Sequence, residues 1–102
     1  MVIDFLKLQP PVFIGEGNPM LSDKWLEEIE KCLDTMVMGD DATHIRLATF
    51  QLRDATETWW KSTKNTTPIA TMIWVMFERL FLEQFFLKVI QDAKRKEFIA
   101  LI

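Results

Sequence analysis

Apolar residues recur at helical spacing along most of the chain after residue 21. One stripe follows the spacing i, i+4, i+7, i+8 and i+11 that is typical of an amphipathic helix, and it consists of Trp25, Ile29, Cys32, Leu33 and Met36. Ser22 has a hydroxyl that can accept a hydrogen bond from the first turn, and Gly39 can adopt the left-handed conformation that ends a helix. We therefore expect the first helix to begin at Ser22 and to end near Gly39.

The pattern predicts two shorter helices next. Asp40 or Asp41 can cap a second helix, whose apolar residues are Ile45, Leu47, Ala48, Phe50 and Leu52. After a break near Arg53, the sequence Asp54-x-x-Glu57 has the form of a capping box for a third helix. This third helix carries Trp59 and Trp60, and we expect Trp59 to be the more deeply buried of the two.

Two further helices are expected after a polar loop at residues 61–68, which reads KSTKNTTP. Thr71 can cap a long helix whose inward face has aromatic residues at i, i+3, i+7 and i+11, namely Trp74, Phe77, Phe81 and Phe85. Asp92 is expected to start a last helix with Phe98 and Leu101. Because no run of alternating polar and apolar residues is convincing, the pattern predicts an all-α fold, a small bundle of about five helices.

Residues 1–21 follow a different pattern, in which prolines and glycines are dense. Pro10-Pro11 fixes an extended backbone, while Gly15, Gly17 and Asn18-Pro19 are turn signals. The apolar residues between them, Phe13 included, are too many to stay solvated. Within a single domain, we expect residues 1–21 to form an extended arm that lies against a helical part spanning residues 22–102, with Phe13 buried.

Composition and charge exclude several classes of protein. A chain of 102 residues has the length of one domain, and 49% hydrophobic residues exclude intrinsic disorder. The lone Cys32 cannot form an internal disulfide, which favours a reducing, cytoplasmic location. A net charge of −3 gives no footprint for nucleic acid. Charged residues interrupt the apolar segment 73–90 and exclude a membrane-spanning helix.

The sequence offers little for catalysis or for a cofactor. His44 is the only histidine, so a metal site would depend on carboxylates and one thiol, and we expect none. Cys32 lies on an apolar stripe, where cysteine behaves as a small hydrophobic residue. Gly15-Glu16-Gly17 precedes no strand–helix turn and so predicts no phosphate loop. We expect no catalytic residue and no cofactor.

Several blocks together resemble a known family. Phe5-x-Lys7-Leu8-x-Pro10-Pro11-x-Phe13-x-Gly15-x-Gly17-x-Pro19, followed by Trp25-Leu26-x-x-Ile29-Glu30-Lys31, is similar to the opening of a gypsy-type LTR retrotransposon Gag capsid domain. The next blocks follow in that family's order: Leu47-Ala48-x-Phe50-x-Leu52-Arg53, Ala55-x-x-x-Trp59-Trp60, Trp74-x-x-Phe77-x-x-x-Phe81-Leu82-x-x-Phe85-Phe86 and Glu97-Phe98-x-x-Leu101. The chain therefore resembles the N-terminal lobe of the capsid.

This resemblance implies a structural protein whose large apolar side chains hold a bundle together. The expected core and signature residues are Phe13, Trp25, Ile29, Leu33, Phe50, Leu52, Trp59, Trp60, Trp74, Phe77, Phe81 and Phe98. The chain departs from the family at three places. Asp54 stands where glycine is usual, Val75 and Met76 where polar residues are usual, and Leu87 where proline often ends the helix, so this helix is expected to run on toward Lys94.

The sequence also lacks the second capsid lobe and the zinc knuckle that binds RNA in this family, so we expect a fragment or a truncated copy. The expected function is self-association with itself or with other Gag chains in a virus-like shell, and the candidate interface is Val75, Met76, Leu82 and Phe86. The alternative is a domesticated module that binds peptide segments in an apolar groove beside the arm. No direct binding to nucleic acid and no membrane partner are expected, and an enzyme is the least favoured class.

Overall fold

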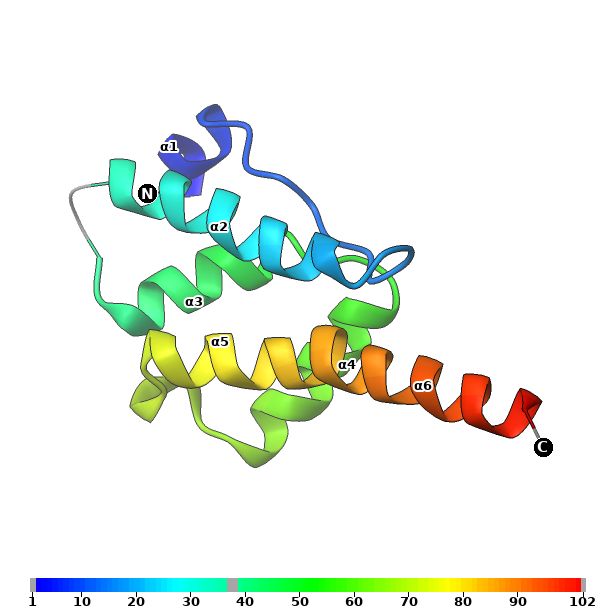
Figure 1. The fold of residues 1–102 in the computed structure, drawn as a ribbon. Helices are drawn as coiled ribbons and strands as arrows, with labels where there is room; N and C mark the ends of the chain where they lie inside the picture. The colour runs from blue at the N-terminus through cyan, green and yellow to red at the C-terminus, as the bar shows by residue number, and fades with distance from the viewer. Residues whose placement is uncertain (1, 37–38, 102) are drawn as a thin grey trace.

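The computed structural model describes residues 2–36 and 39–101, and nearly all regular structure in that part of the chain is helical (Figure 1). The α-helices are α1 (Val2–Lys7), α2 (Met20–Thr35), α3 (Asp41–Thr49), α4 (Ala55–Thr66), α5 (Trp74–Leu82) and α6 (Lys88–Ala100). The prediction of an all-α bundle is therefore confirmed. None of the described helices is both long and apolar enough to cross a bilayer.

The C-terminal quarter of the chain is one continuous helical rod. A π-helical turn, η2 (Glu83–Leu87), joins α5 to α6 without a break. The expected run-on past Leu87 is therefore confirmed, and the expected new start at Asp92 is wrong, because residue 92 lies inside α6. In Figure 1, α6 projects away from the other helices.

Helix α2 begins and ends earlier than the sequence suggested. It starts at Met20, whose N–H donates to Asn18 Oδ1 over 2.9 Å, so the asparagine provides the hydrogen bond that was expected from Ser22. Ser22 lies inside the first turn and is buried. The helix ends at Thr35, four residues before Gly39, so Gly39 does not terminate it.

The ends of α3 and α4 give one correct expectation and one error. Asp40 caps α3, since its Oδ1 accepts from the N–H of Thr43 over 2.9 Å. The expected loop at residues 61–68 is wrong, because α4 continues to Thr66. These polar residues are solvated nearly all round the end of the helix, and Lys61 pairs with Glu57 over 3.6 Å.

The start of α5 also differs from the expectation. Thr71 belongs to a short 3-10 turn, η1 (Ile69–Thr71), and α5 begins only at Trp74. The first N–H of the helix donates to Asp41 Oδ2 of α3 over 3.0 Å. A carboxylate distant in sequence thus satisfies the helix end, in place of the threonine expected to do so.

The arm is partly helical, which corrects the expectation of an extended segment. Residues 2–7 form α1, which packs through the fully buried Phe5, and the following residues run back along α2 (Figure 1). The extended part makes an isolated β-bridge between Phe13 and Leu52. Phe13 is buried as expected, with 8% of its surface exposed.

The core is an aromatic cluster centred on Phe81. Its ring centroid lies 5.0 Å from those of Phe13 and Trp25, and 5.1 Å from that of Phe85. Such tilted contacts between rings stabilise the fold beyond the contribution of the apolar area that the rings bury. The cluster connects the arm with α2, α5 and η2, so it holds the N-terminal part of the chain against the C-terminal helical rod.

The expected core residues fall into three groups. Those that the structure buries are Phe13, Trp25, Ile29, Leu33, Leu52, Trp60, Phe77 and Phe81. Trp59 and Trp74 are partly buried at the edge of the cluster, so Trp60 is the deeper of the adjacent indoles, and the expected order was wrong. Phe50 and Phe98 are 57% and 66% exposed and do not belong to the core. Phe50 lies in a turn, whereas Phe98 lies on the part of α6 beyond the bundle.

Candidate interaction surfaces

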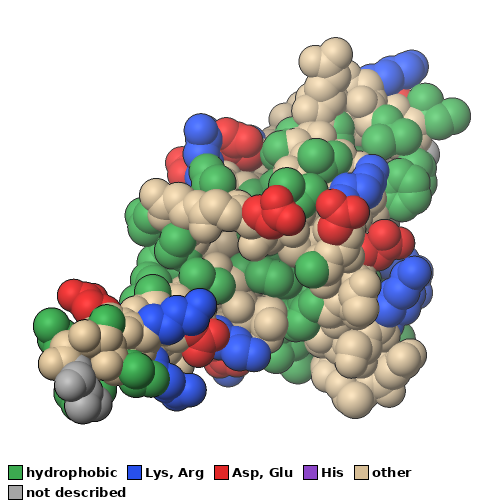
Figure 2. Space-filling view, turned by 90° about the vertical axis from the view of Figure 1, so that its right-hand side faces the viewer, with side chains coloured by type: hydrophobic (Ala, Val, Ile, Leu, Met, Phe, Trp, Pro, Cys, Tyr) green, Lys and Arg blue, Asp and Glu red, His purple; other side chains and the backbone are tan. Residues whose placement is uncertain are grey.

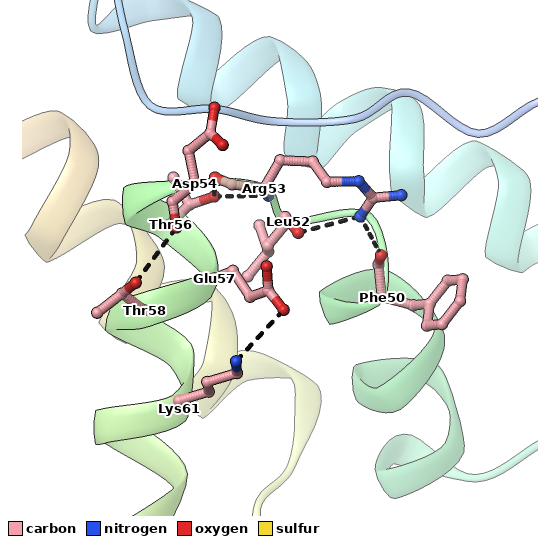
Figure 3. A network of polar contacts seen from close by, with 8 residues as sticks. All are labelled: Phe50, Leu52, Arg53, Asp54, Thr56, Glu57, Thr58 and Lys61. Atoms are coloured by element: carbon pink, nitrogen blue, oxygen red, sulfur yellow. Dashed lines mark hydrogen bonds and ion pairs between the residues drawn. The ribbon is translucent and has the colours of Figure 1, made fainter.

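The turn between α3 and α4 fastens the arm to the bundle. The N–H of Phe13 donates to Gln51 O, and Phe13 O accepts from the N–H of Arg53, each over 3.0 Å. The buried hydroxyl of Thr56 donates to Phe13 O over 2.8 Å and accepts from the Arg53 N–H over 3.0 Å. Arg53 in turn donates from its guanidinium to the carbonyls of Phe50 and Leu52 (Figure 3). The residues of this turn therefore fix the position of the arm.

Asp54 occupies the N-cap position of α4 in an unusual conformation. Its φ is +59° and its ψ is −130°, a combination that glycine adopts readily and residues with a Cβ adopt rarely. The carboxylate makes no capping hydrogen bond, so the expected capping box does not form. The chain therefore keeps a glycine-type turn at the position where the resembling family usually has glycine.

The arm leaves a groove on its outer side, between its extended part and the start of α2. The groove has a volume of about 300 Å³, and its walls include Val12, Ile14 and Trp25. Val12 and Ile14 are 54% and 41% exposed. In the described part of the chain, no hydrogen bond uses their backbone groups, whereas both backbone groups of Phe13 are bonded. The groove is thus bordered by a short strand edge, the extended backbone at Val12 and Ile14, whose groups are unpaired among the described residues.

The candidate interface on α5 is partly open to solvent. Val75 is 58% and Met76 is 38% exposed, while Leu82 and Phe86 are partly buried. Val75 and Leu82 are seven residues apart and share one side of α5, and Met76 is turned by about 100° from Val75. The four residues therefore border α5 and η2 on more than one side, and Val75 and Met76 are the two most accessible.

A basic groove lies between α3 and α4. It has a volume of about 540 Å³, and its charged residues are Arg46, Arg53, Glu57, Lys61 and Lys64. Phe50 lines the same groove, which explains why a residue assigned to the core is exposed. Figure 3 shows Glu57 and Lys61 directed into the space between the two helices. No local pattern in the sequence predicts this groove, because its cations come from separate elements.

An acidic face lies on α2 where it meets α5. Asp23, Glu27, Glu30 and Asp34 follow helical spacing, so they lie along one side of α2. Burial, and then the carboxylates of Glu30 and Asp23, raise the pKa of Glu78 on α5 above its ordinary value. The indole N–H of Trp74 donates to Glu30 Oε1 over 2.9 Å. Negative charge is therefore concentrated along this edge.

Cys32 and His44 are placed where structural roles suffice. Burial, reinforced by Glu28, raises the pKa of the Cys32 thiol, which favours the protonated form over the reactive thiolate. His44 is partly buried and borders an acidic pocket of about 240 Å³ beside Trp74. Across residues 2–36 and 39–101, no group of three or more His, Cys, Asp or Glu side chains is arranged to hold a metal ion.

Apolar side chains also reach the surface elsewhere. In the face drawn in Figure 2 they are visible at several places between charged side chains. Exposed apolar residues lie at both ends of α6: Leu87 of η2 and Val89 near its start, and Phe98, Ile99 and the C-cap residue Leu101 near its end. They do not form a single stripe, because charged residues separate the two groups.

Comparison with protein families gives a match over most of the chain. Residues 7–86 match a family model described as retrotransposon-derived protein PEG10, N-terminal capsid-like domain. The matched range contains the extended part of the arm, helices α2 to α5 and most of η2. Comparisons with curated proteins and with solved structures found no match.

Proposed function

Because the chain belongs to the family of retrotransposon-derived, PEG10-type N-terminal capsid-like domains, we propose that it works by associating with other copies of itself through exposed helical surfaces. The family match confirms the resemblance to the N-terminal lobe of a Gag capsid. Membership supports a Gag-derived, capsid-like role, and the family is structural and generally non-enzymatic. The proposal adds the self-association and the surface that mediates it.

The observation that carries the proposal is the exposure of Val75 and Met76 at the start of α5. Two neighbouring apolar side chains on a helix inside the family-matched region favour a contact with another protein over permanent solvation. Leu82 and Phe86 continue the apolar surface along α5 and η2. Burying such a surface against an equivalent helix would remove it from water, which drives association.

The test compares three chains by sedimentation velocity across a range of concentrations. The parent is expected to form larger species as concentration rises, and the Val75→Glu/Met76→Glu variant is expected to remain monomeric with an unchanged helical circular dichroism spectrum. The control is Ile99→Glu/Leu101→Glu, which makes the same chemical change at exposed positions at the C-terminal end of α6, outside the family match. A parent that stays monomeric, or a control that dissociates equally, would refute the proposal.

A second candidate function is supported by the strand edge at Val12 and Ile14. An extended peptide could pair with their free backbone groups and place alternate side chains in the groove beside the arm, which is the β-augmentation mode of recognition. Titrating apolar peptides into ¹⁵N-labelled chain should shift the amide resonances of both residues. Ile14→Pro removes one donor and should weaken binding. Shifts that spread over α6 instead would contradict this mode.

A further inference from the structure

Two charged surfaces of opposite sign lie on different parts of this domain. The basic groove between α3 and α4 contains four cationic side chains and one carboxylate. The acidic face on α2 presents Asp23, Glu27, Glu30 and Asp34 along one side. Because the whole chain carries a net charge of −3, this separation is a local feature and does not follow from the average composition.

The cations of the groove are only partly neutralised within the chain. Lys61 pairs with Glu57 over 3.6 Å, and Arg53 donates to the carbonyls of its own turn. Arg46 and Lys64 are exposed and form no ion pair with any other described residue. The groove therefore has unused positive charge, and the exposed ring of Phe50 lies beside it.

The acidic face likewise has more negative charge than its own chain balances. Lys31 approaches Glu27 only to 4.0 Å on the solvated surface, which contributes little. The pKa of Glu78 is raised partly because Glu30 and Asp23 are close to it, so the carboxylates repel one another there. A cation brought to this face from outside would relieve that repulsion.

We propose that the acidic face of α2 in one copy of this domain docks into the basic groove between α3 and α4 of a second copy. The inference rests on the proposed self-association and assigns it a second, charged contact. From Asp23 to Asp34 the acidic side chains extend over about 16 Å at the rise of an α-helix. Lys61 and Lys64 lie on α4 and Arg53 directly precedes its N-cap, so the cations of the groove also follow a helix.

A second copy fits the groove better than RNA does. Glu57 lies among the cations of the groove and would repel a phosphate backbone. When the acidic face of a second copy docks, Glu57 can stay paired with Lys61 while the other cations pair with the carboxylates of that copy. The net negative charge of the chain also opposes the approach of a long polyanion. Since the two surfaces are different, the contact is head to tail: one copy retains its free groove and the other its free acidic face, so a further copy can bind at either end.

The experiment uses two neutralised variants of the full chain. Arg46→Gln/Lys64→Gln removes the unused charge of the groove, and Asp23→Asn/Glu27→Gln removes half of the acidic side chains. Each is expected to weaken self-association by about 2- to 30-fold, the effect of losing two exposed ion pairs. A 1:1 mixture should restore a dimer, because each variant retains the surface that the other lacks. Lys94→Gln/Lys96→Gln on α6 is the matched control and should associate like the parent.

The outcomes separate this inference from the proposed function. Association that weakens as sodium chloride rises from 50 to 500 mM supports the charged contact. Association that is unaffected by salt and by both variants overturns the inference and leaves the proposed α5 surface intact, whereas a parent that never associates overturns both. A single-stranded RNA oligonucleotide added to the parent should not bind. RNA binding that is lost in Arg46→Gln/Lys64→Gln would assign the groove to nucleic acid and overturn the inference.

Discussion

Replacing Asp54 by glycine is expected to stabilise the domain. At φ +59° and ψ −130° the Cβ of Asp54 crowds the neighbouring backbone, and a residue held in such a region costs about 1–3 kcal/mol. Glycine relieves that strain but gives the unfolded chain more freedom, which costs about 0.4–1 kcal/mol. The difference leaves a net gain of up to about 2.6 kcal/mol for the backbone change, with a central value of about 1.3 kcal/mol.

Asp54→Ala is the matched control, because it removes the carboxylate and keeps the Cβ. The carboxylate makes no capping hydrogen bond, so its removal loses only a favourable interaction with the helix dipole, of about 0.3–1 kcal/mol. The comparison of glycine with alanine therefore isolates the backbone strain. For a domain of this length, Asp54→Gly should melt roughly 5–15 °C above Asp54→Ala.

The measurement is thermal unfolding followed by circular dichroism at 222 nm, together with urea unfolding at 25 °C to obtain the free energy of unfolding. Both variants should give the same m-value as the parent, since the folded surface is unchanged. If Asp54→Gly melts at or below the temperature of Asp54→Ala, the turn is not strained and the reasoning fails.

Three other substitutions test the core, the arm contact and the acidic face. Trp60→Ala should lower the free energy of unfolding by about 3–5 kcal/mol, and Trp59→Ala by clearly less, because Trp60 is the more buried; equal losses in urea unfolding would contradict this order. Thr56→Val leaves Phe13 O with one partner fewer and should cost about 1–3 kcal/mol, while Thr56→Ser, which keeps the hydroxyl, should cost about 1 kcal/mol in the same assay. Burial raises the pKa of Glu78, so its contribution to stability is fully present below its ordinary pKa and is lost as pH rises through the raised value. The parent should therefore lose stability relative to Glu78→Gln between pH 4 and pH 7, and a constant difference would refute the shift.

Helical periodicity was sufficient to predict most of the bundle. The stripe from Trp25 to Leu33 and the aromatic spacing from Trp74 to Phe81 each define one buried face, so both helices were expected near their actual positions. Exact ends were harder, since Asp41 satisfies the first N–H of α5 from another helix. No local pattern in the sequence contains that contact.

Errors occurred where local polarity was a poor guide to burial. Residues 61–66 are polar because the C-terminal half of α4 is solvated nearly all round, and such a polar run resembles a loop in the sequence. Phe50 and Phe98 are large and apolar, yet one lies in a turn and the other beyond the bundle. The basic groove could not be predicted at all, because the tertiary fold assembles its cations from α3, α4 and the turn between them, whereas the acidic face follows a single helix.

The contact between Phe13 and the α5 rod has a consequence for synthesis on the ribosome. The ring of Phe13 packs against those of Phe81 and Phe85, at centroid distances of 5.0 and 5.4 Å. Roughly 70 residues separate these partners, and a ribosome adds about 5–20 residues each second, so the arm emerges roughly 4–14 s before its partners exist. During that interval Phe13 and Trp25 have no completed core to enter. The nascent arm therefore stays without its native aromatic partners during this interval, and the domain can close only after the last aromatic turn has left the exit tunnel.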